Sequence, residues 1–327
     1  MIRIPGGVLC CGNLVQDILV RPVAEVVFDR TTWVESIQFS LGGNGANTAY
    51  SLAMLGAPVR LLGFTGEDEF GERVLGTLRN PGVDVSRVVR VADEATATTV
   101  VLVHPTGSRA FLHQPGVNRT AFREPVVFSQ ELVGDATHFH LGNPFGLVEL
   151  RSRAGLVMKS AREAGLTTSI DTGWDARGQW LDVVGPCLPF TDILFVNEDE
   201  SRMLSGATDP AVAARFFFER GVKSVVTKVG ARGCIVFEGS DERHVPGFCI
   251  DAVDSTGAGD SFVGGFLGGL YHGMTALEAA RFGNAAGALS ASSLGAVSGL
   301  LPFAETVAWI QRADVAAHSE AGSTKVP

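Results

Sequence analysis

Two hydrophobic patterns alternate along most of the chain: short apolar runs and segments with helical spacing. The apolar runs predict buried strands at residues 7–11, 59–62, 138–141, 167–170, 193–196 and 225–228. The helical spacing predicts helices near residues 46–55, 147–164, 178–184, 198–205, 210–220, 258–271 and 275–292. Strands that alternate with helices in this way favour a doubly wound α/β domain, in which a mostly parallel sheet carries helices on both faces.

Two early segments do not follow this alternation. Residues 14–40 and 96–113 alternate apolar and polar positions without a helical period, which predicts exposed strands. We expect these strands to form a small sheet that projects from the core as a lid over a ligand. Residues 233–250 are expected to add antiparallel strands to the main sheet. The sequence thus predicts a single domain over residues 1–315, followed by a flexible polar tail at 316–327.

Composition and charge narrow the class of protein. The chain has 327 residues and is 46% hydrophobic, which is enough for one large core. Its formal net charge of −9 supplies no basic stripe for nucleic acid or for a membrane surface. No apolar run reaches the roughly 20 residues that a membrane-spanning helix needs, and the N-terminus lacks the pattern of a signal peptide. We therefore expect a cytoplasmic protein with neither nucleic acid nor membrane as a partner.

The segment with the strongest chemical signal reads Asp-Ser-Thr-Gly-Ala-Gly-Asp at residues 254–260 and leads into a predicted helix. Small residues let a ligand approach the backbone, and free amides at a helix start bind anions. In phosphoryl transfer the amides would stabilise the transferred group, while Asp260 accepts the proton of the attacking hydroxyl. An acid that only complements the helix dipole is an equally good interpretation of this segment alone. No Gly-Lys-Ser/Thr follows the glycines, so this is not a Walker A loop.

A second glycine-rich segment, Gly-Gly-Asn-Gly-Ala-Asn at residues 42–47, comes before another predicted helix. Its paired glycines allow a ligand to lie against the backbone, and Asn47 offers a donor and an acceptor to a hydroxyl. A plain glycine-rich loop explains this segment equally well. Its spacing is not the G-x-G-x-x-G of a dinucleotide site.

Both segments, in this order, resemble the signatures of the PfkB carbohydrate kinase family, also called ribokinase-like kinases. Gly-Phe-Thr-Gly-Glu-Asp-Glu-Phe-Gly at residues 63–71 matches a further family segment, and the resemblance covers nearly the whole chain. Ser255 stands in the usual threonine place of the C-terminal signature. The resemblance implies a ribokinase-like fold with a small β-sheet lid and an ATP-dependent sugar kinase. It implies Asp260 as general base, with an anion hole formed by the amides of Gly257, Ala258 and Gly259.

The resemblance also implies a set of substrate contacts. They are Asp17, Gly42, Gly43 and Asn47, with weaker matches at Asn118 and Asn143. Each has a structural alternative. Asp17 could be a surface acid of a lid strand, and Gly142-Asn143-Pro144 is also the sequence of an ordinary turn.

Nucleotide and metal contacts follow from the same resemblance. Those implied for the nucleotide are Asn197, Thr227, Gly230, Gly233 and Asn284. Glu200 would bind Mg²⁺, directly or through water, although Asn197 and Glu200 also fit a helix N-cap with its capping box. Asp254 and Thr256 are candidate ligands of a monovalent cation, K⁺.

The substrate stays open between several classes. Val15 stands where an asparagine precedes the sugar-binding aspartate in ribokinase, and Asn44 replaces a lysine, so both departures argue against ribose. Fructose, another ketose, a sugar acid or a nucleoside fit equally. A nucleoside kinase would need an apolar wall, for which Phe28, Trp33 and Phe39 are candidates.

Two further alternatives concern activity, and one expectation concerns assembly. A non-catalytic sugar or nucleotide sensor on the same fold has no need of the base Asp260. A dinucleotide-dependent oxidoreductase is disfavoured because no G-x-G-x-x-G follows the first strand. The resemblance further implies a homodimer formed through the lid.

Overall fold

The computed structural model describes residues 2–323 and contains two sheets. Nine strands form the larger sheet: β1 (Gly7–Gly12), β4 (Val59–Gly66), β5 (Val88–Val91), β8 (Ala136–Gly142), β9 (Thr167–Asp171), β10 (Ile193–Asn197), β11 (Ser224–Lys228), β12 (Gly233–Glu238) and β13 (Asp241–Pro246). Their order is β13-β12-β11-β10-β9-β8-β1-β4-β5. All neighbours from β11 to β5 pair in parallel, and only β12 and β13 are antiparallel. The predicted doubly wound sheet is confirmed.

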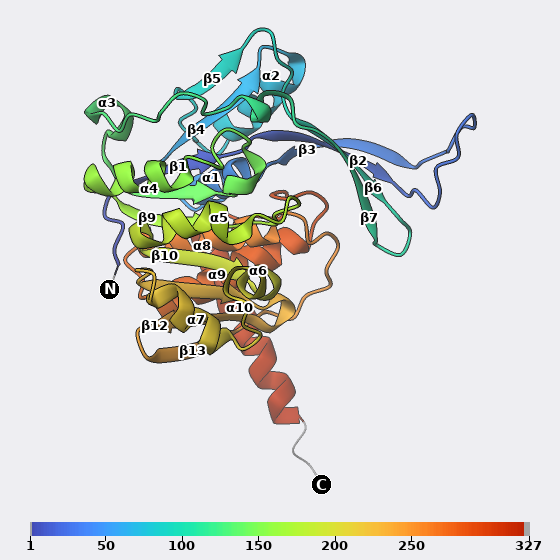
Figure 1. Cartoon of the computed structure of the whole chain (residues 1–327). Coiled ribbons are helices and arrows are strands. Elements are labelled where there is room, and N and C mark those ends of the chain that lie inside the picture. Colours follow the sequence, from blue (N-terminus) through green and yellow to red (C-terminus); the bar gives the residue numbers. More distant parts are fainter. Residues whose placement is uncertain (1, 324–327) are drawn as a thin grey trace.

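Helices cover both faces of this sheet (Figure 1). One core packs beneath α1 (Asn44–Met54), α2 (Glu69–Arg79), α8 (Ala258–Tyr271) and α9 (Ala276–Ala291). The other packs beneath α4 (Ala154–Glu163), α5 (Trp180–Val184), α6 (Glu198–Ser205) and α7 (Pro210–Phe218). Successive strand residues point to opposite faces, so Val8 and Cys10 enter the first core whereas Leu9 and Cys11 enter the second.

The smaller sheet is the predicted lid. Its strands run in the order β3-β2-β6-β7, with bounds β2 (Val15–Arg21), β3 (Ser36–Gly42), β6 (Thr98–Val103) and β7 (Arg109–Gln114). Figure 1 shows these four strands projecting beyond the main body. Strand β2 follows β1 after a gap of two residues, and β3 leads into α1 across Gly43. Both lid connections therefore leave the core at the carboxyl edge of the main sheet.

The observed elements differ from the sequence-based expectation in a few places. Helix α4 begins at Ala154 rather than near 147, because Pro144–Gly146 forms a 3₁₀ turn and the chain continues in turns up to residue 153. Helices α2, α3 (Gln130–Val133) and α10 (Phe303–Ser323) were not predicted, nor was edge strand β5. The segment expected as a tail falls partly on α10, and residues 324–327 lie outside the described residues.

Across residues 2–323, no helix combines the length and apolarity that crossing a membrane requires.

Candidate active site

Five parallel strands end side by side beneath the lid. Their last residues are Gly12, Gly142, Asp171, Asn197 and Lys228. The register pairs Gly12 with Gly142, Gly142 with Asp171, and Asn197 with Lys228. In open parallel sheets the carboxyl edge is where ligands bind. Polar side chains gathered at this edge therefore mark the candidate site.

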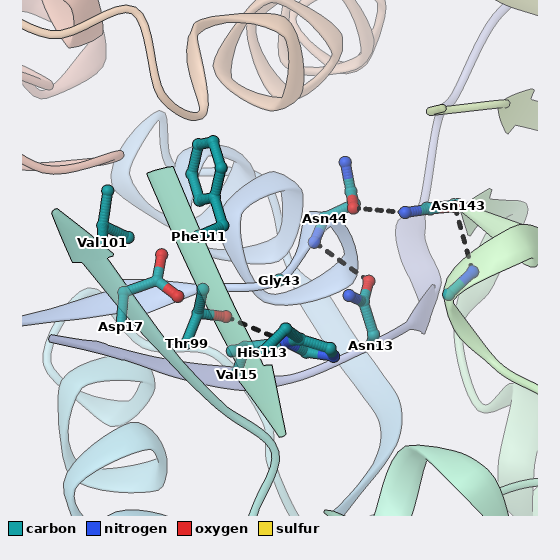
Figure 2. Close-up of a pocket in the computed structure, with 11 residues that line it drawn as sticks. Asn13, Val15, Asp17, Gly43, Asn44, Thr99, Val101, Phe111, His113 and Asn143 are labelled. Atoms are coloured by element: carbon teal, nitrogen blue, oxygen red, sulfur yellow. Dashed lines mark hydrogen bonds between the residues drawn. The ribbon is translucent and has the colours of Figure 1, made fainter. Parts of the chain in front are cut away.

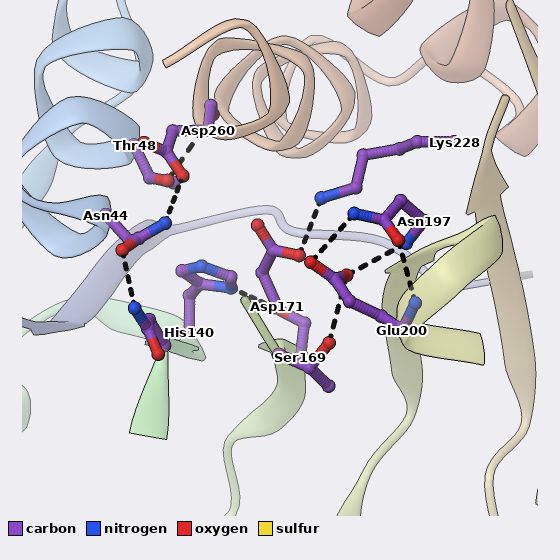
Figure 3. A network of polar contacts seen from close by, with 11 residues as sticks. Asn44, Thr48, His140, Ser169, Asp171, Asn197, Glu200, Lys228 and Asp260 are labelled. Atoms are coloured by element: carbon purple, nitrogen blue, oxygen red, sulfur yellow. Dashed lines mark hydrogen bonds and ion pairs between the residues drawn. The ribbon is translucent and has the colours of Figure 1, made fainter. Parts of the chain in front are cut away.

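Asp260 lies in the first turn of α8 and is held by two asparagines from α1, one of which, Asn44, is seen in Figure 3. Asn44 Nδ2 donates to Asp260 Oδ1 and Asn47 Nδ2 donates to Asp260 Oδ2, each at 2.8 Å. Burial and the nearby Asp171 carboxylate raise the pKa of Asp260 to about 6, although both asparagines and Lys228 oppose the rise. Residues from both glycine-rich signatures thus meet at one carboxylate. Asn47 contacts Asp260 itself, and Asn44 was not predicted as a site residue.

The N-terminus of α8 is shaped by Gly257. This residue caps the helix in the left-handed conformation, with φ of 72°. A Cβ atom there would lie 2.4 Å from Cβ of Ala296, so only glycine fits. The Ala258 amide donates to Ser255 O at 3.3 Å, which engages one of the three amides expected to form the anion hole.

An ion-paired cluster lies beside this helix start. Lys228 Nζ contacts Asp171 Oδ1 at 2.7 Å, and both side chains are largely buried. Although burial opposes it, the carboxylates of Asp171 and Glu200 raise the pKa of Lys228, so the ammonium stays charged. A Cβ atom on Gly259 would lie 3.4 Å from this ammonium. A fixed positive charge therefore stands next to the helix terminus. Neither Lys228 nor Asp171 was predicted as a site residue. Each is the last residue of its strand, and a charged residue at a strand end was the sequence feature that could have identified them.

Glu200 and Asn197 form the capping box of α6. Asn197 Oδ1 accepts from Glu200 N at 2.8 Å, and the Glu200 carboxylate accepts from Asn197 N and Nδ2, each at 2.9 Å. Glu200 Oε2 also accepts from Thr172 Oγ1 at 3.1 Å. Burial and Asp171 raise the pKa of Glu200, while Lys228 opposes the rise. Asn197 and Glu200 therefore form the helix cap that was the structural alternative, and the Glu200 charge interacts with Lys228 and Asp171 beside it (Figure 3).

A cavity of about 280 Å³ opens between the lid and the core (Figure 2). Its lining residues are Asn13, Val15, Asp17, Gly43, Asn44, Thr99, Val101, Phe111, His113, Asn143 and Gly146. Asp17 is 8% exposed, and burial raises the pKa of its carboxyl to about 7; a hydrogen bond from Thr99 opposes this, while Asp254 and Asp260 add to it. The lid thus supplies a carboxyl to a mainly polar cavity of sugar size.

The glycine pair shapes the floor of this cavity. A Cβ atom on Gly42 would lie 2.4 Å from the Asp17 carboxyl carbon, so Gly42 makes room for that side chain although it is not a lining residue. Gly43 does line the cavity and has a φ of 92°. Side-chain clashes at these two positions would displace Asp17 and the start of α1.

Three further asparagines, two of them predicted as substrate contacts, differ in their surroundings. Asn143 lines the cavity and donates from Nδ2 to Asn44 Oδ1 at 2.8 Å. Asn13, which was not predicted, lines it too and accepts from Asn44 N at 3.0 Å. Asn118 is 1% exposed and is not among the lining residues. Within the described chain its side-chain atoms have no hydrogen-bond partner.

The residues expected to contact the nucleotide follow the sheet away from Asp260. Thr227 precedes Lys228 at the end of β11, and its buried hydroxyl has no partner among the described residues. Gly230 and Gly233 occupy the turn into β12, both with positive φ. Asn284 of α9 donates to the carbonyls of Val245 and Pro246 at 3.0 and 3.1 Å, so its amide fastens α9 to β13.

The carboxylates near the sheet edge determine which metal ion the site could hold. No group of three or more His, Cys, Asp or Glu side chains among residues 2–323 is arranged to hold a metal ion alone. Mg²⁺ usually needs only one or two carboxylates together with substrate phosphates, and Asp171 and Glu200 fit that requirement. Asp254 and Thr256, expected at a monovalent cation, instead contact Arg109 of the lid.

The fold and the site define an α/β protein of the phosphoryl-transfer type, with a carboxylate at a helix N-terminus and a lidded polar cavity. The pfkB family carbohydrate kinase profile matches residues 7–303, and the chain belongs to this family. Ribokinase of Haemophilus influenzae is 30% identical over 85% of this chain and 90% of its own length. The ATP-dependent ribose-1-phosphate kinase of Halopiger xanaduensis is 32% identical over 92% and 96%. An E. coli structure in complex with ATP and Mg²⁺ has a TM-score of 0.82 and 26% identity, covering 94% of this chain and 99% of that one.

The buried Asp17 carboxyl should make stability depend on pH. Its folded pKa of about 7 lies above the ordinary value of 3.8, so the folded state loses stability as pH rises between these values. We expect Asp17→Asn to melt at a higher temperature than the wild type at pH 8, by at least about 2 °C, and by less at pH 5. Differential scanning calorimetry measures both. Asp241→Asn, at an exposed carboxyl on β13, is the matched control. An equal or lower melting temperature for Asp17→Asn at pH 8 would contradict the assigned shift.

Proposed function

We propose that this protein transfers the γ-phosphoryl group of ATP to a hydroxyl of a neutral, unphosphorylated sugar, with Asp260 as general base. The observation that carries the proposal is the position of Asp260 between two different surroundings. On one side lies the polar cavity that contains Asn44, and on the other lies the Lys228 ammonium next to the start of α8. A base between a hydroxyl site and an anion site is what phosphoryl transfer requires.

The proposed step is a direct in-line displacement. The sugar hydroxyl gives its proton to an Asp260 oxygen while its own oxygen forms a bond to the γ-phosphorus. The bond between that phosphorus and the β,γ-bridging oxygen breaks, and ADP leaves with the electron pair. The amides of Asn44 and Asn47 hold both Asp260 oxygens, so the base is oriented before the sugar arrives.

Charge on the transferred group would be stabilised by this chain at two places. The amides of Gly257 and Gly259 lie at the positive end of α8, and the Lys228 ammonium lies beside Gly259. Mg²⁺, when bound with ATP, neutralises phosphate charge, and Asp171 and Glu200 would hold it directly or through water. The nucleotide would contact Asn197, Thr227, Gly230 and Gly233 along the sheet and Asn284 on α9.

The cavity favours a neutral sugar. Asp17, Asn13 and Asn143 offer hydrogen bonds to hydroxyls, with Asn47 acting through Asp260 rather than on the sugar. Its lining, all within the described chain, includes neither Lys nor Arg. Burial also lowers the pKa of His113 and keeps that ring neutral. A sugar phosphate or sugar acid would therefore enter beside Asp17 without a neutralising partner. K⁺ does not enter this proposal, because Arg109 already contacts Asp254 and Thr256.

A nucleoside is the second candidate, supported by an apolar wall. Phe111 and Val101 pair across two lid strands and line one part of the cavity, and Phe111 is 57% exposed (Figure 2). Such a ring can pack against a base. Phe28, Trp33 and Phe39, which the sequence suggested for this wall, are not among the lining residues.

A substrate screen separates these classes. ADP release should be measured with ATP and ribose, fructose, 2-dehydro-3-deoxygluconate, ribose 1-phosphate or inosine. We expect kcat/KM for a neutral sugar to exceed that for the charged sugars by about 100-fold or more, since the cavity cannot pair their charge. Preference for inosine would select the second candidate. Preference for a charged sugar contradicts the neutral class, and ADP release with none of them contradicts the kinase function.

Removing the base should slow turnover strongly while sugar binding persists. We expect Asp260→Asn to lower kcat by about 10² to 10⁴, because the hydroxyl proton has no acceptor.

Ionisation of the base also sets the acid limb of the pH profile. Since the pKa of Asp260 is raised to about 6, activity is lost as pH falls through that value. Asn44→Ala removes a donor that favours the carboxylate, so its limb should shift to higher pH. An acid limb that stays at the wild-type pH in Asn44→Ala would contradict this base. So would an Asp260→Asn enzyme that turns over at the wild-type rate.

We also propose a homodimer through the lid. Strand register places Ile18, Val20, Ile37, Val100 and Leu112 on the face opposite the cavity, and Ile37 and Leu112 are each 62% exposed. Light scattering coupled to size exclusion should give a dimer for the wild type and a monomer for Ile37→Asp. Gln38→Asp, on the other face of the same strand, is the matched control. A monomeric wild type would contradict this assembly.

A further inference from the structure

Arg109 connects the lid to the loop that precedes α8. It is the first residue of β7, and its Nη1 donates to Asp254 Oδ1 at 2.6 Å and to Thr256 Oγ1. Its Nη2 donates to Ser255 Oγ at 2.8 Å. One lid side chain therefore contacts all three side chains of residues 254–256, directly before the Gly257 cap.

Four donors contact the Asp254 carboxylate. Oδ1 accepts from Arg109 Nη1 and from Thr256 N and Oγ1, the last two at 2.9 and 2.7 Å. Oδ2 accepts from Gly295 N at 3.0 Å. The three donors at Oδ1 use all the acceptor sites of that oxygen, whereas Oδ2 has room for one more donor. Asp254 therefore ties the lid, the loop near residue 295 and the start of α8 to one group.

This arrangement does not fit a monovalent cation at Asp254 and Thr256. Such an ion would have to share Asp254 Oδ1 and Thr256 Oγ1 with Arg109, which already donates to both. It would also lie close to a guanidinium that never loses its charge, and like charges at that range repel. The positive charge expected at this place is already part of the chain.

We infer that Arg109 is a built-in cation that takes the place of an activating monovalent ion and fixes the helix start that binds phosphate. The inference rests on the proposed kinase function, in which Gly257 and Gly259 stabilise the transferred group. Arg109 is a positioning residue, since it acts through residues 254–256 and touches no reacting atom. Because it belongs to the lid, this support exists only while β7 lies over the core.

The planar guanidinium suits this role better than an ammonium. Its donors are fixed in a fork, so it holds Asp254 and Ser255 through different nitrogens at the same time. Lysine would keep the charge but lose one arm of the contact. Arg109→Lys should therefore recover part of the rate that an uncharged residue loses.

The first test compares the wild-type rate in K⁺ and in choline chloride at equal ionic strength. We expect the two rates to agree within about twofold, because the cation is supplied by the chain. A rise of about tenfold or more in K⁺ would overturn the inference. This arm needs no variant, so it decides the matter even if substitutions at Arg109 do not fold.

The second test uses Arg109→Met, with Arg21→Met as a control at an exposed arginine of the same lid. In choline chloride Arg109→Met should lose about tenfold to a hundredfold in kcat with a smaller change in the KM for sugar, because the phosphate site is misplaced. K⁺ should restore part of this loss, since the Asp254 oxygens become free. A loss that neither K⁺ nor Arg109→Lys reduces would show a packing role and overturn the inference, as would an undiminished rate.

A thermal-shift measurement separates this inference from the proposed function. Without substrates, K⁺ should leave the wild-type melting temperature unchanged relative to choline chloride and should raise that of Arg109→Met. Absence of turnover with every sugar would count against the kinase function alone. Stabilisation of the wild type by K⁺ would count against the built-in cation whether or not the protein turns over.

Discussion

The site depends on the close approach of α1 and α8. A Cβ atom on Gly264 of α8 would lie 2.4 Å from Cβ of Ser51 in α1, and one on Gly45 would lie 2.6 Å from Cα of Gly12. A larger residue at 264 would push α8 away from α1, and one at 45 would push α1 away from strand β1. Because these positions are glycines, the side-chain amides of Asn44 and Asn47 reach the Asp260 carboxylate. Asn47 and Asp260 are 213 positions apart in the sequence.

Several carboxylates lie close together around this site, and two effects reduce the repulsion between them. Burial keeps carboxyls such as Asp17 and Asp260 at pKa values of about 7 and about 6, so their charge is removed easily. Fixed cations offset the rest: Lys228 pairs with Asp171 and Arg109 pairs with Asp254. An acidic protein can bind an anionic nucleotide in this way because its positive groups are placed locally at the helix start.

The lid contributes chemistry to both ends of the site. Asp17 and Phe111 line the cavity, and Arg109 holds the loop before α8. All three lie on the same face of the small sheet, since strand residues two apart share a face. The opposite face is apolar and exposed at Ile37 and Leu112. One four-stranded sheet thus lines the cavity and contacts the loop before α8, and its opposite face leaves apolar side chains exposed.

The sequence by itself determined the alternation of strands and helices, the lid segments and the two glycine-rich signatures, one of which contains Asp260. These are local properties, because periodicity and glycine spacing act over a few residues. Only the tertiary structure decided the partners of those residues. It placed Asn44 on Asp260, ended β9 and β11 at the Asp171–Lys228 pair, and brought Arg109 to Asp254 across 145 positions. Such pairings depend on sheet order and helix packing, which set distances between residues that no local pattern connects.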